Sequence, residues 1–84
     1  MIGANERNSI ASRLSDVFKA VLEVDVSSAL LTPQACERWD SLNHIKLIIA
    51  IEGEFGFQLE IEDVELMYSS FDRCLDHVVS LLAG

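Results

Sequence analysis

Residues 39–56 read WDSLNHIKLIIAIEGEFG, and this stretch decides the fold. A polar, turn-prone region ends at Asp40, and the most apolar helical run of the chain follows it. Asp40 suits the N-cap position, because its carboxylate can accept a hydrogen bond from an early helical N–H. Ser41 then falls in the first turn, where free N–H groups and the positive end of the helix dipole would favour a phosphate attached to the serine. An ordinary helix start without any attached group is the plainer interpretation of the same residues.

The helix predicted over residues 41–55 is apolar on two sides. At about 100° per residue its apolar side chains form two stripes. The first stripe comprises Leu47, Ile48, Ile51 and Phe55, and the second comprises Leu42, Ile45 and Ile49. A chain of 84 residues can readily bury one of them, so we expect the second stripe, which lies nearer Ser41, to be partly exposed as a partner surface. The alternative is a central helix with both stripes in the core. His44 falls on the core side, and Gly56 is placed to end the helix as a C′ glycine.

Before this helix, periodicity predicts one long helix and one long connection. The helix spans about residues 6–22, with Asn5 or Asn8 as its cap. The connection covers residues 23–40, and Thr32 followed by proline could start a single helical turn in it. Loops of this length are usually functional or anchored by their own side chains. The expected anchors are Val24, Val26, Leu30, Leu31 and Trp39.

After Gly56 the chain is predicted to form two further helices. Residues 57–61 alternate apolar and polar, but a single strand has nothing to pair with in a helical chain, so we expect an extended loop. A short acidic helix follows at residues 62–67, and Ser69 or Ser70 caps a last helix at about 71–83. The fold class is therefore all-α: a four-helix bundle with a long first loop and a short third helix. We expect one domain over residues 1–84.

Charge and composition exclude several classes of partner. The net charge is −8, from six basic and fourteen acidic residues. An acidic chain is unsuited to nucleic acid, which is bound through Lys and Arg on phosphates, and to anionic membrane surfaces. Basic partner proteins are the natural complement.

The compartment expected for the chain is the cytoplasm. Residues 1–9 contain no apolar segment typical of a secretory signal, and no apolar run approaches the roughly 18 residues of a membrane span. Two cysteines, Cys36 and Cys74, do not make a disulfide framework, so we expect reduced thiols.

Catalytic and metal sites are not expected. Ser41 and His44 are neighbours on a helix, but a hydrolytic triad also needs an oriented third member and an oxyanion site. A chain this short has no room for such a pocket beside a core. Cys36, Cys74, His44 and His77 are zinc-ligand types that lack paired zinc-site spacing. We therefore expect a module on which enzymes act, rather than an enzyme.

Residues 39–57, which read WDSLNHIKLIIAIEGEFGF, resemble the acyl carrier protein family. Asp40-Ser41-Leu42 match the family motif D-S-L at the start of the second helix. Glu52-Gly53-Glu54-Phe55-Gly56 match the ending E-x-E-F-G at the family's spacing. The tripeptide alone is weak evidence, and its combination with the ending is strong. Length, acidity, a long first loop and a short third helix extend the resemblance over nearly the whole chain.

The resemblance implies a cofactor and a carrier function. A phosphopantetheinyl transferase would join 4'-phosphopantetheine from coenzyme A to Ser41, with Asp40 and Leu42 beside the attachment point. The thiol of this arm would carry an acyl group as a thioester in fatty acid biosynthesis, polyketide synthesis or a specialised lipid pathway. Partners would be acyl-transfer, ligase or synthase enzymes with basic docking patches, acting on a monomer. The implied partner-binding residues are Leu42, Ile45, Lys46, Ile49, Glu52 and Glu54.

Some residues depart from the family pattern. Carriers of fatty acid synthesis usually have acids where this chain has His44, Lys46 and Gly53, and Lys46 reverses the charge beside the second stripe. These departures argue against the housekeeping fatty-acid enzymes as partners. Trp39 before the motif and Asn43-His44 after it look more like a specialised, discrete carrier from a secondary pathway. An aminoacyl or peptidyl carrier, which usually has G-G-x-S before the serine, is an alternative that residues 37–40 (ERWD) do not match. The alternative from another class is a non-modified helical protein–protein interaction module.

Overall fold

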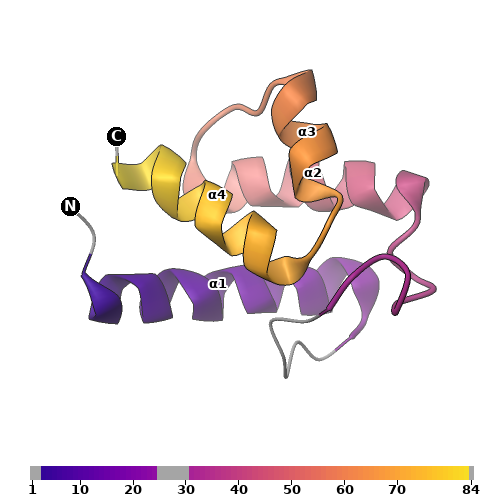
Figure 1. The fold of residues 1–84 in the computed structure, drawn as a ribbon, viewed down its shortest axis with the longest axis horizontal. Helices are drawn as coiled ribbons and strands as arrows, with labels where there is room; N and C mark the ends of the chain where they lie inside the picture. Colours follow the sequence, from indigo (N-terminus) through magenta and orange to yellow (C-terminus); the bar gives the residue numbers. More distant parts are fainter. Residues whose placement is uncertain (1–2, 25–30, 84) are drawn as a thin grey trace.

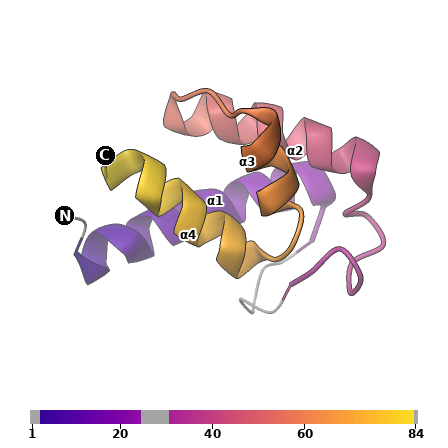
Figure 2. The ribbon, with the colours of Figure 1, turned by 45° about the horizontal axis from the view of Figure 1, so that its top comes forward.

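The computed structural model describes residues 3–24 and 31–83 of the chain. Within these residues the fold is all-helical, as predicted, and no strand is present. The four helices are α1 (Ala4–Leu22), α2 (Ser41–Phe55), α3 (Ile61–Met67) and α4 (Phe71–Ala83). Helices α1 and α2 pack side by side and run in opposite directions, α4 crosses in front of α1, and the short α3 lies steeply across α2 (Figure 1; Figure 2). No helix in the described ranges has the length and apolar character needed to cross a membrane.

Helix α1 begins earlier than its sequence predicts. Gly3 is the N-cap, in an extended conformation, and its carbonyl accepts from the N–H of Arg7 at 3.0 Å. The predicted start near residue 6, with Asn5 or Asn8 as the cap, is therefore wrong, because both asparagines lie inside the helix. The last turn ends as predicted at Leu22, and Glu23 follows in the left-handed region with φ 56°.

The connection between α1 and α2 is fixed to the rest of the molecule where it is described. The N–H of Ala35 donates to Thr32 Oγ1 at 3.2 Å and to the Thr32 carbonyl at 3.1 Å, so the predicted helical turn is a hydrogen-bonded turn. The Leu31 carbonyl accepts from the N–H of Phe71 at 2.9 Å, which ties this segment to the start of α4. Trp39 is buried, and Val24 and Leu31 pack against the core as expected. Val26 and Leu30 lie outside the described residues.

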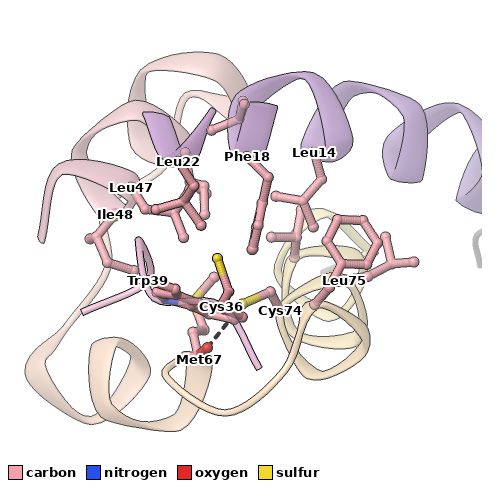
Figure 3. Close-up of a cluster of buried hydrophobic side chains, with 14 of the residues drawn as sticks. Leu14, Phe18, Leu22, Cys36, Trp39, Leu47, Ile48, Met67, Cys74 and Leu75 are labelled. Carbon is pink, nitrogen blue, oxygen red and sulfur yellow. Dashed lines mark hydrogen bonds between the residues drawn. The ribbon is translucent and has the colours of Figure 1, made fainter. Parts of the chain in front are cut away.

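One core joins all four helices and the connection (Figure 3). Phe18 of α1 lies at its centre and contacts two other aromatic rings edge-on: Trp39, with 5.2 Å between centroids, and Phe71, with 5.0 Å. The fully buried side chains are Leu14, Phe18, Leu22, Trp39, Leu47, Ile51, Met67, Cys74 and Val78. Of the stripe of α2 that was expected to be buried, Leu47, Ile48 and Ile51 are in the core, and Phe55 is partly buried against it.

Helix α2 has the predicted bounds, because each end has a strong local signal. Asp40 caps its start, and Gly56 ends it with φ 76°, its N–H donating to the Glu52 carbonyl at 2.9 Å. Helix α3 begins at Ile61, one residue before its predicted start. Glu60 and Asp63 form a reciprocal capping box there, in which each side chain accepts from the backbone N–H of the other residue. The hydroxyl of Ser70 accepts from the N–H of Arg73 at 2.9 Å, so Ser70 caps α4.

Two glycines of α2 give a matched test of backbone conformation. A Cβ at Gly53 or at Gly56 would meet nothing within 4 Å, so packing would not change. Gly56→Ala is expected to lower the free energy of unfolding by about 1–2 kcal/mol, because an L-residue is strained at positive φ. Gly53→Ala is expected to raise it by about 0.5–1 kcal/mol, because glycine is a poor helix residue. Urea unfolding followed by circular dichroism measures both, and a change of the same sign in the two variants would contradict this account.

Candidate functional site

The candidate site is the start of α2, where a serine hydroxyl is exposed. The carboxylate of Asp40 accepts from the N–H of Asn43 at 2.8 Å, and the Asn43 side chain donates to the Arg38 carbonyl at 2.6 Å. These bonds hold residues 38–43 in one arrangement. Ser41 is the first helical residue and is exposed, and its hydroxyl has no hydrogen bond to any residue that the structure describes. Free N–H groups and the helix dipole at this point would stabilise an anion carried by the serine.

The second stripe of α2, defined by Leu42, Ile45 and Ile49, is exposed. Their accessible fractions are 66%, 51% and 63%, whereas Leu47 and Ile51 on the opposite face are fully buried. The predicted exposure of one stripe is therefore confirmed, and the alternative of a helix buried on both sides is wrong. Ser41 lies at the start of the helix, and the stripe begins beside it at Leu42 and continues to Ile49 in the middle of the helix. Together they form an exposed hydroxyl beside an apolar surface.

The acids in the last turn of α2 are engaged within the chain. Glu52 accepts from the N–H of Leu59 at 2.8 Å, which holds the loop after α2. Glu54 forms an ion pair with Arg13 at 2.9 Å, and the same guanidinium lies over the ring of Phe55, 4.6 Å from its centroid. Sequence reasoning assigned these acids to partner binding and missed their intramolecular partners.

Lys46 is the cation beside the exposed stripe. It lies on α2 one residue after Ile45 and its side chain is exposed. It forms no ion pair with any acid in the described residues, unlike Arg13 and Arg38, which pair with Glu54 and Glu23. Lys46 therefore presents an exposed positive charge beside the stripe.

Directly behind Ser41, the ring of His44 is buried at 3% exposure. Its Nδ1 lies 3.0 Å from the indole nitrogen of Trp39, and its Nε2 lies 2.7 Å from the carbonyl oxygen of Val64 in α3. Tyr68, at the end of α3, stacks on the ring with 4.6 Å between centroids, and its hydroxyl donates to the Trp39 carbonyl at 3.3 Å. The prediction that His44 faces the core is confirmed, and its partners were not predicted.

The two hydrogen bonds of His44 fix its protonation state. An indole N–H can only donate and a carbonyl can only accept, so Nδ1 carries the lone pair and Nε2 carries the proton. The ring is therefore neutral. Burial lowers the pKa of His44 below the ordinary value of 6.5, and the bond to the Val64 carbonyl opposes this only in part.

The lowered pKa of His44 predicts a dependence of stability on pH. The unfolded chain takes up a proton on this side chain as the pH falls through about 6.5, whereas the folded chain does so only at lower pH. The stabilisation is complete above pH 6.5 and is lost as the pH falls from there to the folded pKa. We expect the free energy of unfolding, measured by urea titration at a series of pH values, to decline more over this window in the wild type than in His44→Gln. Equal declines would contradict the assignment to His44.

In the described part of the chain, no base is available beside Ser41 and no cluster of metal-binding side chains forms. Both ring nitrogens of His44 are occupied by Trp39 and Val64, so neither can act as a base for Ser41. No group of three potential metal-binding side chains occurs among the residues described. Both cysteines are free and buried, and burial raises the pKa of the Cys74 thiol to about 12. They pack in the core, as sequence reasoning expected.

A second histidine joins α3 to α4 away from this site. His77 Nε2 lies 2.7 Å from a carboxylate oxygen of Asp63. The pKa of Asp63 is lowered, first by the hydrogen bond from the backbone N–H of Glu60 and then by His77. Sequence reasoning missed this contact, because the two residues are 14 positions apart on different helices.

Comparison with known proteins finds no relative of this chain. Neither a protein-family model, nor a curated protein, nor a solved structure matches the chain. The arguments for function therefore come from the residues of the site and from the motif that surrounds Ser41.

Proposed function

We propose that this chain is an acyl carrier protein that bears 4'-phosphopantetheine on Ser41. The observation that carries the proposal is the exposed Ser41 hydroxyl at the first residue of α2, next to the Asp40 cap and the exposed stripe. The resemblance of residues 39–57 to the acyl carrier family supports it. The all-helical fold with a short α3 is of the kind that this resemblance implies.

The modification asks little of the chain itself. Ser41 Oγ attacks the phosphorus of coenzyme A that bears the pantetheine group, forming an Oγ–P bond. The P–O bond of the pyrophosphate linkage breaks, and adenosine 3',5'-bisphosphate leaves with the electron pair. A base on the transferase takes the hydroxyl proton, since His44 is engaged elsewhere. The resulting phosphodiester is an anion at a helix N-terminus, where the free N–H groups of α2 stabilise it.

Once attached, the arm would present its thiol to partner enzymes as the carrier of a thioester. The stripe formed by Leu42, Ile45 and Ile49 would then serve as the docking surface beside the arm. Lys46 is an exposed cation beside this surface and has no ion pair in the described residues, while Glu52 and Glu54 are engaged within the chain. The exposed cation beside this surface supports partners of a specialised lipid or polyketide pathway more than the enzymes of housekeeping fatty acid biosynthesis.

A second candidate function uses the same stripe without any modification. Three apolar side chains exposed on one helix face would suit a helical protein–protein interaction module. An aminoacyl carrier is the alternative within the family, and it shares the attachment at Ser41. The acyl carrier proposal and the interaction module differ in one measurable property, the covalent adduct.

Intact-mass spectrometry tests the proposal directly. The folded wild type is incubated with coenzyme A, magnesium and a broad-specificity phosphopantetheinyl transferase, alongside an established carrier as the positive control. We expect complete conversion to the mass of the phosphopantetheine adduct. A folded chain that gains no mass while the control carrier is converted would contradict the proposal and leave the interaction module.

A further inference from the structure

His44 joins three segments that are separate in the sequence. Its backbone belongs to α2, its Nδ1 accepts from Trp39 at the end of the first connection, and its Nε2 donates to Val64 in α3. Tyr68 completes the set, because its ring stacks on His44 and its hydroxyl donates to the Trp39 carbonyl. One neutral imidazole thus holds the connection, α2 and α3 together.

This junction surrounds the serine in the sequence. Trp39 lies two residues before Ser41 and His44 three residues after it. The first turn of α2 is therefore held from both ends: Trp39 is fixed by the imidazole and by Tyr68, and His44 is fixed by α3. The Asp40 cap lies between these two fixed points.

We propose that neutral His44 is a positioning residue for the modification of Ser41, and that protonation at its Nδ1 releases Trp39 and loosens the start of α2. The proposal rests on the proposed function, because it concerns the reaction at Ser41. His44 acts through Trp39 and the helix start, and it does not touch the reacting atoms.

Protonation breaks the junction for a geometric reason. A proton on Nδ1 would point at the indole N–H, so that two donors face each other and the hydrogen bond is lost. The charged ring would also remain buried without a counter-ion. The surroundings confirm this: no described carboxylate pairs with His44, and Tyr68 is the ionisable side chain that contacts the ring.

The charged groups of the neighbouring elements are directed elsewhere. Asp40 binds the N–H of Asn43, and Asp63 binds the N–H of Glu60 and His77. The remaining charged side chains of the described residues are exposed, paired at the surface or, for Glu52, bound to the N–H of Leu59. They are Glu6, Arg7, Arg13, Asp16, Lys19, Glu23, Glu37, Arg38, Lys46, Glu52, Glu54, Glu60, Glu62, Glu65, Asp72, Arg73 and Asp76. Cys74 is a neutral thiol that donates to the Met67 carbonyl. None of these groups offers the imidazolium a partner.

The first half of the test follows the junction itself and needs no modification. Trp39 is the single tryptophan, so its indole N–H gives one resolved signal in a ¹H–¹⁵N spectrum. The signal is followed from about pH 8 downward until the chain unfolds, in the wild type and in His44→Gln. Glutamine can accept from the indole and donate to the Val64 carbonyl, but it does not titrate. We expect the wild-type signal to move with a midpoint below 6.5 and the variant signal to stay in place.

The second half measures the reaction. Wild type and ¹⁵N-labelled His44→Gln are mixed in one transferase reaction at each pH, so that the pH dependence of the transferase cancels in the ratio of their initial rates. At the midpoint of the indole titration half of the wild-type molecules are released, so the ratio of wild type to variant is expected to fall about twofold there. It is expected to be constant above pH 7 or so, where the ring is neutral.

The outcomes separate the two proposals. An indole signal that does not titrate in the wild type, or that titrates equally in His44→Gln, would overturn the junction. A titrating indole with a constant rate ratio would overturn the positioning role. If neither chain were modified at any pH, the proposed function would fail, and the positioning role would fail with it. The indole titration would still show whether protonation of His44 breaks its hydrogen bond with Trp39.

Discussion

Replacing Trp39 with alanine is expected to lower the free energy of unfolding by about 3–5 kcal/mol. The indole is buried at 1% exposure, packs edge-on against Phe18 and donates to His44. Its removal leaves a cavity between α1 and α2 and leaves the lone pair of a buried imidazole without a partner. For a chain of this length a total stability of about 4–12 kcal/mol is expected, so the loss is a large part of it. Urea unfolding followed by far-ultraviolet circular dichroism measures it without the tryptophan.

Trp39→Phe separates packing from hydrogen bonding. Phenylalanine keeps an aromatic ring against Phe18 but has no N–H for His44. We expect a smaller loss, of about 1–3 kcal/mol, which is the cost of an unsatisfied buried polar group. The loss should shrink at acidic pH, because His44 no longer accepts a hydrogen bond once it is protonated. Equal losses for the two variants, or a loss in Trp39→Phe that does not depend on pH, would contradict this account.

Ser41→Ala is expected to abolish the phosphopantetheine adduct completely while the fold is retained. Alanine has no oxygen to form the phosphodiester. The Ser41 hydroxyl makes no hydrogen bond with a described residue and is exposed, so the free energy of unfolding should change by no more than about 0.5 kcal/mol. Intact mass and urea unfolding of the same sample measure both effects.

Ser69→Ala provides the matched control for this variant. Ser69 is also exposed and lies shortly before a helix, α4, but no D-S-L motif surrounds it. We expect Ser69→Ala to be modified as completely as the wild type. An adduct that persists in Ser41→Ala would place the attachment on another residue. Loss of the adduct in both variants would show that the loss in Ser41→Ala does not identify Ser41 as the attachment point.

The sequence predicts α2 and its two faces well, because both depend on local signals. The aspartate cap marks the start of the helix and the glycine at positive φ marks its end, and each signal comes from a residue directly next to the helix. The division into a buried and an exposed stripe follows from angular spacing along a single helix. The exposure of Ile45 and Ile49 and the burial of His44 could therefore be predicted without knowing the neighbouring helices.

The contacts that set the charge of the site could not be predicted in this way. Glu54 pairs with Arg13 across 41 positions, and His44 meets Val64 across 20. Such pairs depend on how helices pack against one another, which periodicity does not specify. The start of α1 was missed for a different reason: its cap is Gly3, which makes no side-chain hydrogen bond, while two asparagines nearby gave a misleading capping signal.

The buried cysteines have a practical consequence for chemical labelling. Cys36 is 7% exposed, and Cys74 is fully buried with a raised pKa, so the native chain offers alkylating reagents little reactive sulfur. A prosthetic arm on an exposed Ser41 would end in a thiol that lies in water. A maleimide added to the native protein would then react with arms whose thiol is free, and the same reagent added in urea would react with Cys36 and Cys74 as well. The difference between the two counts would thus separate the thiol of the prosthetic arm from the two thiols of the core.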